Sequence, residues 1–392
     1  MTNQSNILAT ARRFIVPFFV ILGFGYFNYA LNYSLGYNEI YKHHSHASAI
    51  VLWCLTGFCE FCVLIYWALI LYVGPGISPK FPQWNLFQNS ELENELLPTP
   101  DIFFCDEFGY PYYDSHTQSM KIDRSFYSKY FEHVILKYDH HCLWVGTSIG
   151  LTNYLYFLKF CFWFLALFII MLIYSAKYTR STIARGEINH NLIPIFIACG
   201  LWIPMIAGLL VTHIRYVCLN MTTLDDITLN QRNRYRRYKD RKKQKSSPIC
   251  PQPRKPRKEN GDRYVSVKKE DFRLIIKFDI KERPFDMGFK KNWINLIFNG
   301  NRNNGKSDDY YTTKKFVYGL IIFMCPFVEL PLEFQQRRRI HYDPEMNFKP
   351  IDNIKAEYDY YSSDLSPQFL KMIQMKIDKK DCYIPSYLNY KE

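Results

Sequence analysis

Residues 138–146 read Tyr-Asp-His-His-Cys-Leu-Trp-Val-Gly, so that an acid, two imidazoles and a thiol follow one another shortly before an apolar stretch. A cysteine thiol titrates near pH ~8.5, and its thiolate is the form that attacks a carbonyl carbon. A histidine accepts the thiol proton when a carboxylate on its far nitrogen fixes the tautomer. The run therefore predicts Cys142 as a catalytic nucleophile, and the residues that assist it are Asp139, His140 and His141.

From the residues alone, two other interpretations of this run stay open. Imidazole and thiolate are zinc ligands, so His140, His141 and Cys142 would also supply half of a zinc site. The same residues would equally serve as three polar side chains at a membrane surface. The sequence on either side of the run has to distinguish these cases.

Apolar and polar residues are segregated along the 392-residue chain. Only two charged residues, Glu60 and Lys159, occur in four apolar runs, which are residues 14–35, 49–73, 154–174 and 192–211. Each run has roughly the 20 residues that a helix needs to cross a membrane. Glu60 predicts a functional carboxyl or one that is hydrogen-bonded between helices. Lys159 is expected to extend its ammonium group to the cytosolic face.

Basic residues near the ends of these runs predict the orientation. Arg12 and Arg13 precede the first run, and nine Lys and Arg residues lie in the segment 232–245 after the fourth. Both termini are therefore expected in the cytosol, although the turn between the last two runs is also basic. The first run lacks small cleavage-site residues at its end, so it predicts a retained helix instead of a signal peptide.

The net charge of +13 leaves membrane lipid and nucleic acid as candidate partners. No nucleic-acid recognition motif accompanies the charge, whereas a juxtamembrane cluster such as 232–245 is attracted to anionic lipid by about 1 kcal/mol per charge. We therefore expect contact with membrane lipid and none with nucleic acid. Residues 246–261 are rich in Pro and Lys and predict a disordered linker. The eleven cysteines lie in the apolar runs or face the reducing cytosol, so no structural disulfide is expected.

Residues 139–142 form the full signature of the DHHC family of protein S-palmitoyltransferases, which this chain resembles. The flanking positions agree with the family at Trp144, Gly150, Asn153, Tyr154 and Phe157. The resemblance implies an all-α polytopic membrane protein, with four transmembrane helices and a small cytosolic DHHC domain between helices 2 and 3. It divides the chain into an N-terminus with the first helix, a lumenal turn with the second helix, the DHHC domain, the third and fourth helices, and a cytosolic tail. Their bounds are 1–35, 36–74, 75–153, 154–218 and 219–392.

Three further segments resemble family motifs. Residues 74–76 are similar to its Asp-Pro-Gly motif, with Gly74 in place of the acid, and predict a firm helix exit. Residues 221–225 are similar to its Thr-Thr-x-Glu motif, with Asp225 as the acid, although a plain helix-capping segment would read the same way. Asn292 matches the asparagine by which family members tie their tail to the membrane domain.

The resemblance also implies two zinc ions, each held by three cysteines and a histidine, and here this chain departs from the family. The corresponding residues are Asp114, Thr117, Tyr127, Ser128, Phe131, Val134, His141 and Ser148. Zinc sites of this type need thiolates or imidazoles, so no conventional zinc pair is expected, and aromatic packing is expected to replace the metal. A residual site from Asp114, His116, His133 and His141 is the alternative. The loss resembles a fungal Pfa branch of the family, as does the Cys-Asp-x-x-Gly-x-Pro opening of residues 105–111.

The resemblance and the position of the thiol together predict a multi-pass S-acyltransferase of an endomembrane or the plasma membrane. Its cosubstrate is palmitoyl-CoA, it holds no permanent cofactor, and its partners are cytosolic-face proteins with acceptor cysteines. The acyl chain is expected among the rings of Tyr154, Phe157, Phe160, Phe162 and Phe164. Because CoA is polyanionic, its phosphates are expected at Lys121, Arg124, Lys129 and Lys137. The rival hypothesis is a non-catalytic membrane scaffold or transporter that retains the fold.

Overall fold

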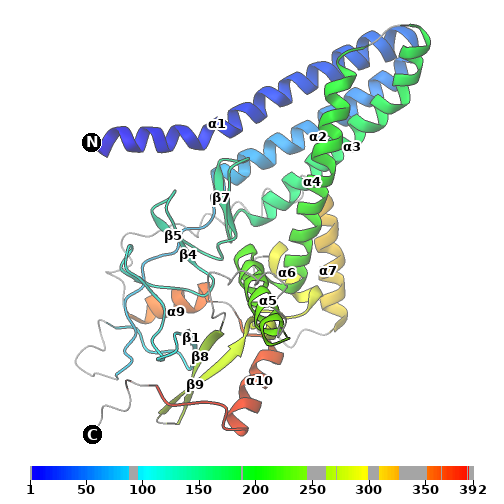
Figure 1. The fold of residues 1–392 in the computed structure, drawn as a ribbon. Coiled ribbons are helices and arrows are strands. Elements are labelled where there is room, and N and C mark those ends of the chain that lie inside the picture. Colours follow the sequence, from blue (N-terminus) through cyan, green and yellow to red (C-terminus); the bar gives the residue numbers. More distant parts are fainter. Residues whose placement is uncertain are drawn as a thin grey trace. The chain divides into compact units, whose positions relative to one another are not determined.

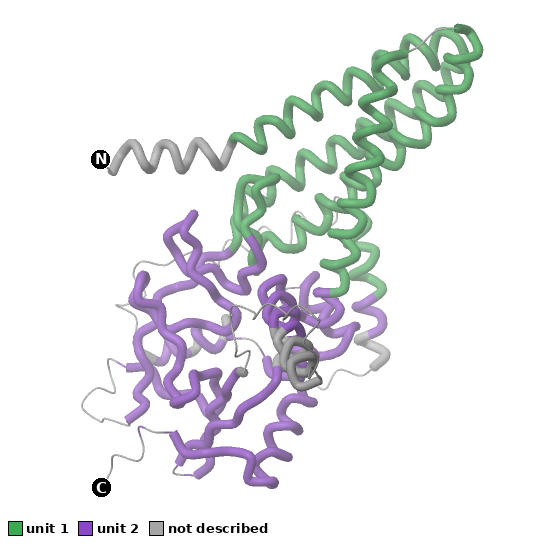
Figure 2. The backbone as a smooth tube through the Cα atoms, in the orientation of Figure 1, with its two compact units in different colours: residues 1–75, 141–215, 317–338 green, residues 76–140, 216–316, 339–392 purple. Residues whose placement is uncertain are grey.

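A computed structural model describes residues 2–87, 96–186, 189–244, 262–270, 272–298, 309–325, 351–362, 364–385 and 387. The chain forms two compact units, coloured green and purple in Figure 2. The first unit comprises residues 1–75, 141–215 and 317–338, and the second comprises 76–140, 216–316 and 339–392. The boundary runs through the motif of residues 139–142, between His140 and His141. The linker expected at 246–261 lies outside the described residues.

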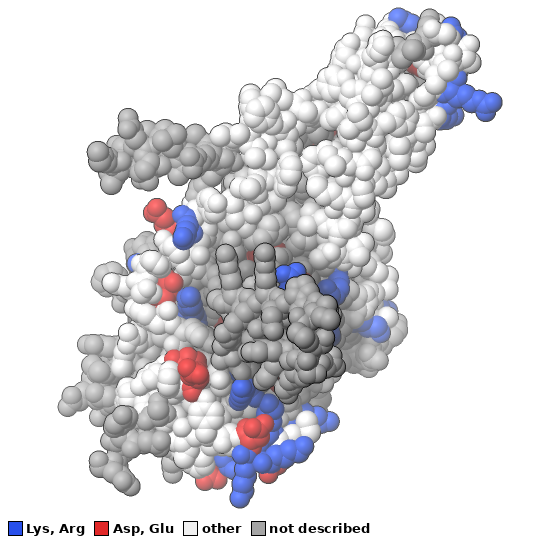
Figure 3. Space-filling model, in the orientation of Figure 1, with Lys and Arg blue, Asp and Glu red and all other residues white. Residues whose placement is uncertain are grey.

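The first unit is built from long helices (Figure 1). They are α1 (Thr2–Asn28), the π-helix η1 (Tyr29–Tyr41) that continues it, α2 (His46–Val73), α3 (Tyr154–Ala184) and α4 (Leu192–Leu219). The helix α2 packs along α3, and η1 packs against both. On the face shown in Figure 3, this unit is uncharged along most of its length and carries Lys and Arg at one end.

Four of these segments are long and apolar enough to cross a membrane. They are Ile15–Tyr41, His46–Val73, Tyr154–Ala184 and Leu192–Leu219. The four expected spans are therefore confirmed in place, but each helix continues past the apolar run by which the sequence delimited it. The end of η1 shows why, because Glu39 is buried there in an ion pair with Arg185, just beyond the end of α3. This ion pair thus stabilises the part of η1 that extends beyond the apolar run.

The turn after α2 ends the helix as the sequence predicts. Gly74 adopts a φ of 70°, a left-handed conformation that favours glycine, and Pro75 follows it. At the other end of α2, the Ser45 side chain accepts a hydrogen bond from the Ser48 amide at 3.3 Å. Both ends of α2 are therefore set by local sequence.

The second unit contains β-strands, so the expectation of an all-α fold is wrong for this part of the chain. An antiparallel sheet has the order β1-β8-β9, from β1 (Ile102–Cys105), β8 (Asp262–Lys269) and β9 (Phe272–Asp279). Two hairpins accompany it, β2 (Tyr113–Asp114) with β3 (Ser119–Met120) and β4 (Phe126–Ser128) with β5 (His133–Ile135). In the sheet, Phe103 pairs with Ser266 and Val265 pairs with Ile276.

The core of this unit is completed by the C-terminal tail. Helix α10 (Pro367–Asp378) places Phe369 and Ile373 on the buried face of β8 and β9. Helix α9 (Ile351–Tyr361) places the ring of Tyr358 5.6 Å from that of Trp84, and Trp84 meets Phe103 at 4.6 Å. The expected aromatic packing is present, and tail residues from which the sequence predicted little supply part of it.

The remaining described elements follow α4. Helix α5 (Thr223–Gln244) begins two residues after Met221, and the short helices η3 (Ile280–Glu282) and α6 (Phe289–Ile297) come after β9. The last eight residues of helix α7 (Asp309–Met324) belong to the first unit.

Candidate active site

The predicted nucleophile lies on a short hairpin in front of α3. Strand β6 (His140–Cys142) pairs with β7 (Thr147–Ile149), and the amide of Gly146 donates to the Cys142 carbonyl oxygen at 2.9 Å to close the turn. Gly146 has a φ of 81°, as this turn requires. Because side chains alternate along a strand, His140 and Cys142 share one side of β6 and His141 has the other. Cys142 itself is buried.

Side chains of the first unit fix this hairpin to the end of α2. The indole Nε1 of Trp67 donates to the Val145 carbonyl oxygen at 3.1 Å, and Thr152 Oγ1 donates to that of Gly74 at 2.6 Å. Asn153 is fully buried, and its amide nitrogen lies 2.9 Å from the Ser148 oxygen and 3.3 Å from that of Ile70. The loop that carries the thiol is therefore held by hydrogen bonds to backbone groups on both sides.

The carboxylate of Asp139 is buried and joins two partners. Its Oδ2 lies 2.7 Å from His140 Nδ1, and the same oxygen accepts from Thr223 Oγ1 at 2.7 Å. Its Oδ1 accepts from the Thr223 amide at 2.8 Å. The carboxylate is thus held on both oxygens and fixes the imidazole that it touches.

The segment before α5 is both a helix cap and a tie to this carboxylate. Thr222 Oγ1 accepts from the Asp225 amide at 3.2 Å, and Asp225 Oδ2 accepts from the Thr222 amide at 3.1 Å. This is a reciprocal capping box, so aspartate serves in place of the glutamate of the family motif. Thr223, one residue on, makes the contacts with Asp139. Residues 221–225 therefore serve both as a helix-capping segment and as the motif that connects the tail with Asp139.

Two of the predicted CoA-binding residues converge on one asparagine. Arg124 Nη1 donates to the Asn220 carbonyl oxygen at 2.9 Å and to its Oδ1 at 3.1 Å, and Lys137 Nζ donates to the same Oδ1 at 3.0 Å. The pKa of Lys137 is lowered to about 7, chiefly by burial and also by the charge of Arg124, while Asp139 and Asp225 oppose the change. Lys121 pairs with Asp114 at 3.8 Å. Lys129 is exposed.

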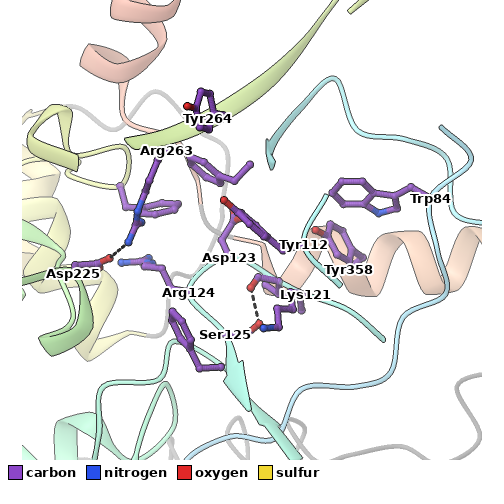
Figure 4. Close-up of a pocket in the computed structure, with 14 residues that line it drawn as sticks. Trp84, Tyr112, Lys121, Asp123, Arg124, Ser125, Asp225, Arg263, Tyr264 and Tyr358 are labelled. Carbon is purple, nitrogen blue, oxygen red and sulfur yellow. Dashed lines mark hydrogen bonds and ion pairs between the residues drawn. The ribbon is translucent and has the colours of Figure 1, made fainter. Parts of the chain in front are cut away.

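A cavity of about 270 Å³ opens in the second unit beside Arg124 (Figure 4). Lys121, Arg124 and Arg263 line it, together with Asp123 and Asp225, but Lys129 and Lys137 do not. Arg263 extends from β8 to Asp225, with Nη2 3.3 Å from Oδ1. Burial raises the pKa of Asp123 to about 7, although Arg124 and Arg263 oppose the rise. The rest of the wall is mostly aromatic and includes Trp84, Tyr112, Tyr264 and Tyr358.

An apolar cavity of about 460 Å³ lies among the helices of the first unit. Trp144, two residues after Cys142, lines it and packs against Trp202 of α4 with ring centroids 5.0 Å apart. Phe160 and Phe164 are in its wall as expected, whereas Tyr154, Phe157 and Phe162 are not among its lining residues. Most of the remaining wall comes from α1. Glu60 also lines it, and Oε2 accepts from Asn28 Nδ2 at 2.6 Å, so the hydrogen bond between helices, one of the two alternatives for this residue, is present.

Four of the donors at the family's zinc positions are hydrogen-bonded in two pairs. Asp114 Oδ2 accepts from Thr117 Oγ1 at 2.7 Å, and His141 Nδ1 lies 3.1 Å from Ser148 Oγ. Phe131 and Val134 offer no lone pair. The alternative site from Asp114, His116, His133 and His141 is not gathered into one cluster in the part of the chain that the structure describes. These residues do not fit the zinc pair of the family.

Residues 107–230 match the family model described as DHHC palmitoyltransferase. The palmitoyltransferase PFA5 of Candida albicans is 48% identical over 377 residues, which cover 96% of this chain and 93% of the relative. This chain belongs to the DHHC palmitoyltransferase family. PFA5 of Saccharomyces cerevisiae is 29% identical over 242 residues, covering 57% of this chain and 65% of that protein. The prediction of a palmitoyltransferase of the fungal Pfa type is confirmed. The matched segment of the DHHC family runs on through α3 and α4.

Two residues of the family site were not predicted from the sequence as contacts. Thr223 was identified only as part of a motif, although its hydroxyl donates a hydrogen bond to the Asp139 carboxylate. Arg263 lies 38 residues beyond Asp225 in a strand that was not predicted, so no local pattern marked it. In contrast, Asn292 Nδ2 donates to the carbonyl oxygen of Cys218, near the end of α4, at 2.8 Å. This contact of the tail lies within the second unit, at the last turn of α4.

Proposed function

We propose that Cys142 carries the acyl group between acyl-CoA and the cysteines of protein substrates. The observation that carries this proposal is the bond between Asp139 and His140. A carboxylate at Nδ1 stabilises the tautomer with a hydrogen there, which leaves Nε2 as the basic nitrogen for the thiol proton. The thiolate of Cys142 then attacks the thioester carbonyl, CoA leaves as its thiolate, and the enzyme is acylated. A substrate thiolate repeats the attack on acyl-Cys142 and restores the free thiol.

The apolar cavity supports a place for the fatty chain. It lies among helices that are long enough to cross a membrane, and Trp144 connects its wall with the hairpin of Cys142. Burial of an acyl chain contributes about 0.8 kcal/mol per methylene. The cavity is therefore the site at which palmitoyl-CoA gains most of its binding energy.

For the head group of CoA, the charged cavity of the second unit is the best supported site. Lys121, Arg124 and Arg263 bring three cations to its wall, and aromatic rings there offer faces for a base. Arg263→Gln is expected to raise the KM for palmitoyl-CoA, while the exposed Lys129→Gln serves as the matched control. An equal KM in the two variants would remove the charged cavity from the proposal.

The proposed arrangement in the membrane is that predicted from the sequence. The termini are cytosolic, the segment 75–153 is a cytosolic domain between the second and third spans, and 219–392 is a cytosolic tail. The basic residues flanking the first and fourth spans support this orientation. The membrane is an endomembrane or the plasma membrane.

The test of the function is direct acylation. The full chain in lipid nanodiscs is incubated with an alkyne analogue of palmitoyl-CoA, and the label on Cys142 is expected to be released by hydroxylamine. Cys142→Ser is expected to lose both the label and transfer to an acceptor peptide. Cys105→Ser is the control, because burial raises the pKa of Cys105 to about 12 and keeps that thiol protonated. Retained transfer in Cys142→Ser would refute the assignment of the nucleophile.

A further inference from the structure

Lys159 lies in the wrong place for a lysine that reaches the membrane surface. It is five residues into α3, or roughly 8 Å from the start of the helix at 1.5 Å per residue. Its side chain is completely buried, so the expectation that it extends to the cytosolic face is wrong. A buried ammonium group in a membrane-spanning helix is costly unless it has partners.

The partner of Lys159 is the end of another helix. Its Nζ donates to the carbonyl oxygen of Ile322 in α7 at 2.7 Å. The ammonium group also lies over the rings of Tyr66 and Phe323, at 5.5 and 5.9 Å from their centroids. Tyr66 belongs to α2, so the lysine joins α2, α3 and the last turn of α7.

The sequence explains why this carbonyl needs a donor from outside α7. In a helix, a carbonyl accepts from the amide four residues later, and for Ile322 that residue is Pro326, which has no amide hydrogen. Water cannot satisfy the carbonyl in hydrocarbon. Lys159 supplies the missing donor and places a positive charge at the negative end of the helix dipole. Pro326 leaves the Ile322 carbonyl without an amide donor, and this explains why a lysine is buried beside it.

The last eight residues of α7 are apolar on both sides. On the inner side, Ile322 and Phe323 are buried, and the Phe323 ring meets Phe162 of α3 at 5.8 Å. The outer side is about half exposed and consists of Val317, Tyr318, Ile321 and Met324. A helix that is apolar all round is surrounded by protein or by lipid. Lys314 and Lys315 come directly before this segment and suit the anionic head groups of lipids.

We propose that residues 317–324 of α7 are embedded in the bilayer, in the leaflet that surrounds the first turns of α3, with Lys159 as their anchor. The occupant of the outer face is lipid hydrocarbon. Eight residues of helix rise about 12 Å, so the segment enters one leaflet and does not cross the membrane. It is a membrane-embedded element in addition to the four helices that are long enough to span.

The experiment measures the contact of α7 with lipid in the full chain. A fluorescent amino acid is introduced at Ile321, and the protein is placed in nanodiscs with and without phosphatidylcholine that carries a nitroxide on its acyl chain. The same amino acid at Lys269, which is exposed in the second unit, is the control. Strong quenching and blue-shifted emission are expected at Ile321 and neither at Lys269.

Three results would overturn the inference or a part of it. Water-like emission at Ile321, unquenched by the nitroxide lipid, would show that α7 lies outside the bilayer. Blue-shifted emission without quenching would show that protein covers the face in place of lipid. The anchor is tested by Lys159→Met, which is expected to reduce the quenching at Ile321, while Lys159→Arg keeps a donor and is expected to retain it. Unchanged quenching in Lys159→Met would remove Lys159 from the proposal.

Discussion

Thr223 and Asp139 are joined by two hydrogen bonds, one from the hydroxyl and one from the amide, although 84 residues separate them. The carboxylate oxygen that accepts from the hydroxyl is also the one next to His140. Thr223 therefore acts on the imidazole through Asp139, as a positioning residue.

The first prediction concerns this hydroxyl. Thr223→Val keeps the shape and the amide bond but removes one hydrogen bond to a carboxylate, an interaction worth about 1.5–3 kcal/mol. We expect the rate of Cys142 acylation to fall roughly tenfold, with a shifted pH profile and a modest fall in the melting temperature. Thr223→Ser restores the donor and is expected to recover the rate. The same loss in both variants would indicate a steric cause.

The second prediction separates the two histidines. His140 touches Asp139, whereas His141 lies on Ser148, on the other side of the strand. His140→Ala is expected to slow acylation by the roughly 10²–10⁴-fold of a lost general base, and to move the pH dependence of Cys142 alkylation upward. His141→Ala is expected to retain much of the activity. If His141→Ala proves the more damaging change, the two roles are reversed.

The third prediction concerns zinc. The positions that hold zinc ligands in the family carry Asp114, Thr117, His141 and Ser148 in hydrogen-bonded pairs, and others are apolar. We expect zinc far below stoichiometric amounts in the purified protein, and acylation that is unaffected by chelators. Elemental analysis and a chelator titration measure the two quantities. Stoichiometric zinc would show that residues outside these pairs bind the metal.

The fourth prediction concerns Asp123. Its pKa in the folded protein is raised from the ordinary 3.8 to about 7, chiefly by burial. Between about pH 4 and pH 7 the folded state then holds a proton that the unfolded state has released, so the free energy of unfolding falls as the pH rises. The Asp123→Asn side chain cannot ionise, so the free energy of unfolding of this variant does not fall in this way as the pH rises.

The melting temperature of Asp123→Asn is therefore expected to rise relative to wild type between about pH 5 and about pH 8. Asp352→Asn, at an exposed position of α9, controls for the substitution itself. A constant difference between Asp123→Asn and wild type across this range would mean that the Asp123 carboxyl titrates in the ordinary way.

The sequence predicts the membrane helices well, because an apolar run of about 20 residues needs no distant partner to be recognised. It also predicts the bond of His140 with Asp139, since the two residues are adjacent. The shortest strands were missed because two- and three-residue strands such as β2 and β6 carry no readable periodicity. Strand β1 forms by pairing with β8, where Phe103 lies opposite Ser266. The sequence around β1 carries no signal of so distant a partner.

The predicted phosphate-binding residues show the same limit. Lys121 and Arg124 lie in one cavity wall, but the asparagine shared by Arg124 and Lys137 comes from far along the chain. Charge alone did not distinguish these partly buried cations from the exposed Lys129. For Lys159 the composition of the span predicted an extended side chain, because the carbonyl that it meets belongs to Ile322, 163 residues away.

The position of Thr223 also has a consequence for biogenesis. A ribosome makes Asp139, His140 and Cys142 before α3 and α4, and Thr223 only after both helices. In the nascent chain, the Asp139 carboxylate therefore lacks its two hydrogen bonds from Thr223 until the fourth helix has been synthesised. Strand β8, the partner of β1, is made later still. The order of translation thus delays the complete set of hydrogen bonds around Asp139 until α3 and α4 have been synthesised.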